Sequence, residues 1–262
     1  MNCQSAQIEP DALVDLIVST IKAEVVNARS ITTYREPLVG FCSAEDPKFK
    51  ELCSDYIPAH YLPGELIEGA KSVVSFFIPF DSLVVKANSR DKHSVAQEWA
   101  QAYVDTNSLI SRITRQLISE LDARGILSAA EPATHNFDPL TLKCRWSHKS
   151  IAVIAGLGSF GLHNMVITDS GCAGRFGSLV IDRELPVSKP APKNRCLYFK
   201  DKSCRACVER CPTGALKEDG SIDKQACYAR LLEVAEIYKS IGVADVCGKC
   251  ALGPCSLKSP VS

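Results

Sequence analysis

The chain has 262 residues, of which 46% are apolar, and its 30 basic residues balance 30 acidic ones. This length supports one large domain or two smaller ones with a real core, which argues against disorder. A formal net charge of zero provides no global field for a polyanion, so DNA or tRNA is not expected as a partner. The N-terminus lacks the features of an export signal, and the longest apolar runs, 73–80 and 151–157, are far shorter than the roughly 20 residues that span a bilayer. We expect a cytoplasmic protein with reduced thiols and no membrane segment.

The first part of the chain alternates between helix and strand patterns. Apolar residues recur every three or four positions over residues 11–28, which predicts an amphipathic helix. Residues 31–70 contain four prolines and indicate mostly loop and short helix. The run 72–80 is apolar on both faces and predicts a buried strand. Residues 95–121 predict a long helix that packs on the core and ends near Gly125.

A glycine-rich segment follows a short helix predicted over 147–155. Gly156, Gly158 and Gly161 match the spacing G-x-G-x-x-G of dinucleotide-binding loops. A Rossmann loop opens a long helix, whereas here a strand predicted over 164–168 is followed at once by a turn, so this interpretation is not favoured. A tight turn near the sheet, or a close approach of the backbone to another flat or phosphate-bearing cofactor, remains open. With a further strand over 176–181, the pattern predicts an α/β or α+β domain.

Eight of the 13 cysteines lie between positions 196 and 255. The segment from Cys204 has the spacing C-x2-C-x3-C-P, which is the later part of the bacterial ferredoxin run. The first cysteine of that run is missing: Asp201 stands in its place, and Cys196 is the nearest replacement. Eight thiolates are what two [4Fe-4S] clusters require, because soft sulfur ligands bind iron tetrahedrally.

The ligand sets of ferredoxins interleave, and the same logic divides the eight cysteines. The first thiol set contains Cys196, Cys204, Cys207 and Cys255. The second thiol set contains Cys211, Cys227, Cys247 and Cys250. Two structural zinc sites are the alternative, since C-x2-C pairs also form zinc ribbons. The five other cysteines lack such spacing and are interpreted as ordinary buried thiols: Cys3, Cys42, Cys53, Cys144 and Cys172.

A basic stretch precedes the cysteine module. It is either a solvated face or a docking site for an acidic electron donor. Its residues are Lys189, Lys193, Arg195, Lys200 and Lys202. Pro186, Pro190 and Pro192 mark a linker in the same region.

Together these segments resemble the iron-sulfur proteins related to epoxyqueuosine reductase, which are distant relatives of corrinoid reductive dehalogenases. The resemblance rests on segments 69–74, 89–93, 155–161 and on the cysteine module with 227–231. It implies an α+β chain in which an N-terminal α/β sandwich, similar to the nitroreductase-like corrinoid-binding fold, holds cobalamin. A ferredoxin-like domain with two [4Fe-4S] clusters would supply the electrons. The cofactor-binding residues that it suggests are His93, Gly156, Gly158 and Gly161.

The sequence departs from this family at the expected proton donor. Leu142 stands where epoxyqueuosine reductases have a catalytic aspartate. Asp138, the nearest carboxylate, and His148 are the replacement candidates. The C-terminal helical repeats that the longer relatives use for tRNA are also missing, so a tRNA substrate is not expected.

We therefore expect a cofactor and substrate domain over residues 1–188 and a ferredoxin-like domain over 189–262. The predicted function is that of an oxidoreductase from a low-oxygen environment, which relays single electrons to cobalamin or a small substrate. The electron donor would be a ferredoxin or flavodoxin. The alternative is a non-catalytic electron-transfer protein whose N-terminal domain recognises a redox partner.

Overall fold

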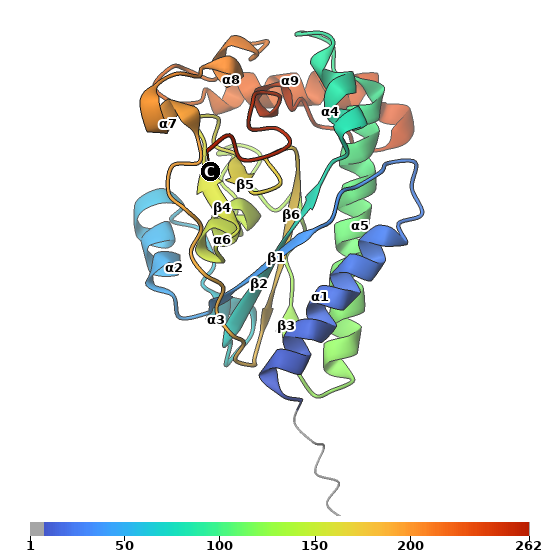
Figure 1. Cartoon of the computed structure of the whole chain (residues 1–262), viewed down its shortest axis with the longest axis vertical. Coiled ribbons are helices and arrows are strands. Elements are labelled where there is room, and N and C mark those ends of the chain that lie inside the picture. The colour runs from blue at the N-terminus through green and yellow to red at the C-terminus, as the bar shows by residue number, and fades with distance from the viewer. Residues whose placement is uncertain (1–7, 262) are drawn as a thin grey trace, which may run out of the picture.

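The main sheet of the protein has four strands, seen near the centre of the computed structural model, which describes residues 8–261 (Figure 1). Its strand order is β1-β2-β6-β3, and every neighbouring pair is antiparallel. The strands are β1 Leu38–Ser43, β2 Ser72–Pro79, β6 Gly174–Ile181 and β3 Ser128–Ala129. A separate two-stranded hairpin consists of β4 Gly158–Phe160 and β5 Val166–Thr168.

Helices cover the sheet and form most of the C-terminal part. The α-helices are α1 Pro10–Val26, α2 Pro47–Glu51, α3 Pro63–Leu66, α4 Ser82–Ser89, α5 Gln97–Asp122, α6 His148–Ile154, α7 Leu197–Asp201, α8 Ala206–Glu209 and α9 Lys224–Ile237. A π-helical turn, η1 Leu52–Tyr56, and two 3₁₀ turns, η2 Lys239–Ile241 and η3 Lys249–Ala251, complete the elements. None of the described helices is both long and apolar enough to cross a membrane.

The central strand β2 is buried on both faces, as its apolar run predicts. Val74, Phe76 and Ile78 point to the face covered by α1 and α5. Val73 packs on the opposite face with residues of α6, and Phe77 joins a neighbouring cluster there. Because side chains alternate along a strand, β2 supplies the core of both layers. The prediction of a mixed α/β fold is confirmed.

The helices predicted over 11–28, 95–121 and 147–155 are confirmed as α1, α5 and α6. The prediction for 31–70 is wrong at Leu38–Ser43, which forms the edge strand β1. Proline and glycine signals masked this strand. Gly40 is required there for packing, because a Cβ atom at this position would lie 2.5 Å from the carbonyl oxygen of Ala155.

The glycine-rich segment forms a helix end and a hairpin. Gly156 has a φ of 77° and follows the last turn of α6, where its N–H and that of Leu157 bond to the carbonyls of Val153 and Ala152. This pattern is a Schellman motif, which uses glycine in the left-handed conformation. Residues 158–160, interpreted as part of a turn, form strand β4 instead. No helix begins at this segment, so it lacks the helix that a Rossmann loop opens.

The cysteine module, with α7, α8 and α9, packs on one end of the sheet, beside the N-terminal end of α5 (Figure 1). A single apolar cluster joins Trp99 and Leu162 of the N-terminal part to Leu216, Val234 and Leu252 of the C-terminal part. The two predicted domains thus share a core, and the boundary near residue 188 stays a prediction.

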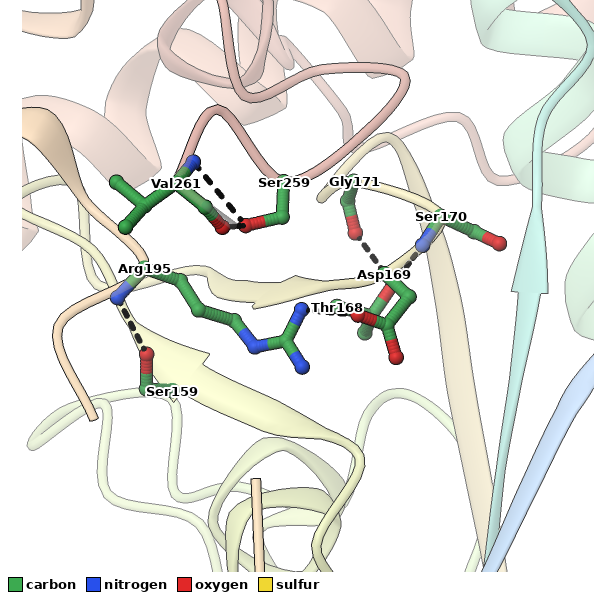
Figure 2. A network of polar contacts seen from close by, with 8 residues as sticks. All are labelled: Ser159, Thr168, Asp169, Ser170, Gly171, Arg195, Ser259 and Val261. Carbon is green, nitrogen blue, oxygen red and sulfur yellow. Dashed lines mark hydrogen bonds and ion pairs between the residues drawn. The ribbon is translucent and has the colours of Figure 1, made fainter. Parts of the chain in front are cut away.

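Two arginines, the half-buried Arg35 and the buried Arg195, connect the C-terminal segment to the sheet. Arg35 donates to the carbonyl oxygens of Phe80, Ser170 and Leu257 at 2.7–2.9 Å. Arg195 lies beneath the turn at Ser259 and points towards Asp169 (Figure 2), with 2.5 Å between Nη1 and Oδ1. Because its own N–H donates to Ser159 of β4 at 3.2 Å, Arg195 ties the start of the module to the hairpin.

Candidate metal centres and the adjoining cavity

The structure brings the first thiol set to one small pocket beside α7 and α8. All four of its cysteines line this pocket, together with His163 from the β4–β5 hairpin. Cys196 caps the start of α7, and Cys207 lies within α8. Asp201, the other candidate for the missing ferredoxin position, is exposed and accepts a hydrogen bond from the N–H of Ser203 at 3.0 Å. The geometry therefore groups Cys196 with the set.

The second thiol set lines a larger cavity of about 320 Å³ between the cysteine module and the end of the sheet. Its wall is mostly aromatic and aliphatic, with Phe80, Trp99, Phe137, Met165, Tyr228 and Leu231. One corner is polar. There the Tyr103 hydroxyl donates to Asp245 Oδ1 at 2.8 Å, and the Arg175 guanidinium lies 4.2 Å from the centre of the Tyr103 ring.

Four of these thiols are costly to ionise without a metal. Burial, followed by the charges of neighbouring cysteines, raises the pKa of Cys207 and of Cys250 to about 12. Burial also raises the pKa of Cys227 and Cys247. A bound cation reverses this effect because it stabilises the thiolate directly, so metal binding releases protons here.

Three buried N–H groups on residues that line the cavity have no partner among the described residues. They are Trp99 Nε1, Arg175 Nε and Arg230 Nε. A buried donor without an acceptor costs about 1–3 kcal/mol, so such groups are rare in native proteins. Their gathering at one cavity indicates an occupant that carries hydrogen-bond acceptors.

Trp99 lies directly against the loop that carries Cys247 and Cys250. Gly248 in this loop has a φ of 70°, and a Cβ atom there would lie 2.2 Å from the Trp99 ring. Only glycine fits both the left-handed backbone and the close approach of the indole. The position of two thiols of the second set thus depends on a helix of the N-terminal part.

Lys249 lies between the same two cysteines in the sequence and is 1% exposed. It holds the loop through hydrogen bonds to Asn88 and Asp91. Its ammonium donates to the Asn88 carbonyl at 2.7 Å, to Asn88 Oδ1 at 2.9 Å and to the Asp91 carbonyl at 2.8 Å. These three acceptors satisfy its three N–H groups. None of them is an anion. Burial lowers the pKa of the Lys249 ammonium, and the charges of Cys247 and Asp91 oppose this effect.

The two candidate catalytic residues lie away from the cavity. Asp138 is exposed, and its Oδ1 accepts from the N–H groups of Leu140 and Thr141 at 2.9 and 2.7 Å, which shapes its own loop. His148 is buried, with Nδ1 2.8 Å from Ser178 Oγ and Nε2 3.0 Å from the Pro132 carbonyl. Burial lowers the pKa of His148 to about 4, so this imidazole is neutral near pH 7.

The candidate cofactor-binding residues also face protein or solvent. His93 is exposed. A Cβ atom on Gly156 would lie 2.3 Å from the Lys189 carbonyl, and one on Gly158 would lie 2.4 Å from the Ile167 carbonyl. On Gly161 it would meet the His163 ring at 2.8 Å. The glycines thus allow neighbouring chain segments to approach, and none of them lines the cavity.

Two residues near the thiols, His163 and Cys172, were not recognised as site residues from the sequence. Cys172, interpreted as an ordinary thiol, is fully buried and belongs to a compact group with His163 and Cys255, whose ligand atoms all lie within 4.8 Å of one another. Cys3 lies outside the described residues, and Cys42 fits the buried-thiol interpretation. No local spacing joins positions 163, 172 and 255, so only the fold reveals this group.

Replacing Lys249 tests whether its buried hydrogen bonds stabilise the protein. Lys249→Met leaves three acceptors without their donor, so we expect the free energy of unfolding to fall by about 2–3 kcal/mol. Urea denaturation of the anaerobic protein, followed by circular dichroism, measures this loss. Lys239→Met is the matched control: Lys239 is 72% exposed at a surface ion pair, and its loss should change stability by less than about 0.5 kcal/mol. Equal effects in both variants would contradict the assignment.

No protein-family model matches the chain. Curated relatives are named epoxyqueuosine reductase. That of Cyclobacterium marinum is 27% identical over 175 residues, which are 64% of this chain and 50% of the relative. That of Vibrio cholerae is 26% identical over 172 residues, which are 64% of this chain and 43% of the relative. The chain thus matches half or less of the length of these relatives.

Solved structures agree on the fold. An epoxyqueuosine reductase bound to an epoxyqueuosine-modified tRNA stem loop matches 95% of this chain and 66% of its own, with a TM-score of 0.62 and 18% identity. A reductive dehalogenase described as B12-dependent matches 87% of this chain and 30% of its own, with a TM-score of 0.58 and 16% identity. In sequence the chain is similar to epoxyqueuosine reductases, and it shares its fold with them and with a reductive dehalogenase.

Proposed function

We propose that this protein is an iron-sulfur oxidoreductase that passes single electrons through two [4Fe-4S] clusters to an acceptor in the 320 Å³ cavity. One observation supports this most: each of the two thiol sets lines a pocket of its own, and the pocket of the second set is the cavity. We place the ferredoxin-like part at residues 189–262, after the proline-rich linker, and the acceptor-binding part at residues 1–188.

The buried N–H donors without hydrogen-bond partners favour iron-sulfur clusters over zinc. A zinc ion bound by four thiolates brings no further hydrogen-bond acceptor into the pocket. The inorganic sulfides of a cluster do, and hydrogen bonds to cluster sulfur are a normal means of tuning its potential. Trp99 Nε1 and Arg230 Nε belong to residues that line the cavity beside the second thiol set.

The arrangement gives the electron path a direction. The second thiol set lines the cavity and the first does not, so electrons enter at the first cluster and leave from the second. Exposed lysines surround the first set at positions 193, 200 and 202, and Phe199 among them is 44% exposed. An acidic donor such as a ferredoxin or flavodoxin matches this basic surface.

The cavity suits a small acceptor. Its volume of about 320 Å³ also has to hold the second cluster, whose four thiols line it, so the space left for an acceptor is below the roughly 300–1,000 Å³ that hold drug-sized ligands. A modified nucleoside within tRNA is not proposed, because the chain has zero formal net charge to attract a polyanion. Reduction of an organic acceptor also consumes protons. The Tyr103 hydroxyl, which is hydrogen-bonded to Asp245 on the cavity wall, is our candidate for the proton donor.

Cobalamin, the cofactor implied by the family resemblance, does not fit the cavity in this shape. A corrinoid is considerably larger than a drug-sized ligand, and Thr134 and Phe137 form part of the wall that encloses this space. We therefore derive no step through it, and we treat cobalamin as a question for metal analysis.

Metal analysis of protein purified without oxygen, incubated with a cobalamin and desalted, tests the function. We expect about eight irons per chain and no zinc, the content of two [4Fe-4S] clusters. Retained cobalt at about one per chain would show that the wall opens for a corrinoid. Zinc in place of iron would overturn the proposal.

The alternative is a non-catalytic electron carrier. It is favoured by the position of Asp138 and His148 away from the cavity. Reduced protein with eight irons that transfers electrons to partner proteins, but shows no ligand-dependent change in the signal of the second cluster, would establish this alternative.

Removing one ligand from each set tests the assignment. Cys204→Ala and Cys250→Ala should each lower iron by about half and destabilise the C-terminal part, because ligation and folding are coupled. Iron and acid-labile sulfide are measured per chain. Cys196→Ser should lose a similar amount, whereas Asp201→Ala should retain all iron. The control Cys42→Ala removes a buried thiol of β1 and should keep eight irons. Full iron in Cys196→Ser would contradict the first set.

The contact between Gly248 and Trp99 predicts a backbone effect on the second cluster. Gly248→Ala forces a methyl group against the indole and should remove about half of the iron, by displacing Cys247 and Cys250. Gly214→Ala is the matched control: its φ of 64° is also left-handed, but nothing lies within 4 Å of the added Cβ atom. This control costs about 1 kcal/mol of strain and should keep its iron. Similar iron loss in both would show that strain alone is responsible.

A further inference from the structure

Cys255 of the first thiol set is contacted by two side chains of the α/β core that are not cluster ligands in either set. His163 Nε2 lies 3.3 Å from Cys255 Sγ, and Cys172 Sγ lies 3.8 Å from the same sulfur. His163 is 4% exposed and Cys172 is fully buried. The contact is held in place by the backbone, because the N–H groups of Cys172 and Ala173 donate to the carbonyls of Cys255 and Ser256 at 2.9 and 3.0 Å.

The backbone also decides which nitrogen of His163 carries the proton. The N–H of Met165 donates to His163 Nδ1 at 3.0 Å. A nitrogen that accepts a hydrogen bond has no proton, so the neutral imidazole is protonated on Nε2. The Nε2–H group therefore faces the sulfur of Cys255 at the distance of an N–H···S hydrogen bond.

The same tautomer excludes a different interpretation. The three atoms His163 Nε2, Cys172 Sγ and Cys255 Sγ are close enough together to hold a metal ion. A metal needs the lone pair of the imidazole nitrogen, and the Met165 N–H leaves the proton on that nitrogen. The group is thus suited to donate hydrogen bonds to a thiolate rather than to complete a separate metal site.

We propose that His163, with Cys172 as a weaker second donor, hydrogen-bonds to the Cys255 thiolate and raises the reduction potential of the first cluster. The inference rests on the proposed function, since it assumes that Cys255 binds that cluster. Donors to cluster sulfur stabilise the reduced, more negative state. The thiol of Cys172 also lies 3.7 Å from the Ala251 carbonyl, so its hydrogen is shared and its effect is the smaller one. Both are positioning residues rather than ligands.

Potentiometric titration of the anaerobic protein, followed by electron paramagnetic resonance, tests this proposal. The signal of the first cluster is identified by its loss in Cys204→Ala. In His163→Leu we expect its reduction to become about tenfold less favourable, which is ~59 mV towards negative potential for one electron. The second cluster should not shift. His163→Gln keeps an N–H group near the same position and should recover most of the potential.

Cys172→Ala and Cys172→Ser form a second pair that keeps the test decisive if His163→Leu fails to fold. The alanine variant should shift the potential in the same direction by less, and the serine variant should restore it through its hydroxyl group. Cys42→Ala, a buried thiol far from both sets, should shift neither cluster. In addition, proton double resonance of the reduced first cluster should show an exchangeable hydrogen that disappears in His163→Leu.

The outcomes separate this inference from the proposed function. Unchanged potentials in His163→Leu and Cys172→Ala, with eight irons present, would overturn the inference alone. Full iron in Cys255→Ala would also overturn it, because the sulfur would not be a ligand, and the clusters themselves would remain. Protein without iron would overturn the proposed function instead.

Discussion

The packing of the cysteine loops against the end of the sheet is the interaction on which the rest of the structure depends. These loops have little regular structure of their own, and α7 and α8 are 5 and 4 residues long. Their positions are set by buried contacts with the α/β core, through Trp99 against Gly248 and through Lys249 against Asn88. Burial raises the pKa of four of the eight thiols, those of Cys207, Cys227, Cys247 and Cys250, and a bound metal would offset this cost by stabilising their thiolates.

The core therefore does more than support the module. It supplies hydrogen-bond donors around both thiol sets, and they come from different elements. His163 belongs to the β4–β5 hairpin and Cys172 to the turn before β6. Trp99 comes from α5, whose side chains also form the main core. Under the proposed function, a substitution in the N-terminal part would thus change the electronic environment of a cluster without replacing one of its ligands.

Much of the thiol arrangement could be predicted from sequence, because the ferredoxin spacing has a direct geometric meaning. The spacing placed Cys204 and Cys207 together, and Cys196 was chosen over Asp201 as the nearest thiol. The outer contacts could not be predicted, since His163, Cys172 and Cys255 come from three separate segments with no common period. Strand β1 was missed for a related reason: Gly40, which resembles a turn signal, serves a close approach to α6.

The two thiol sets differ in how their charge is balanced, and this difference bears on the proposed direction of electron flow. Beside the second set lies the buried Lys249 ammonium, whose three acceptors are all neutral. Beside the first set, the contacts come from two side chains at a single sulfur. A nearby cation and hydrogen bonds to sulfur both stabilise the more negative, reduced state of a cluster. Under the proposed function, the Lys249 ammonium favours an electron on the second cluster, next to the cavity where the acceptor is proposed to bind.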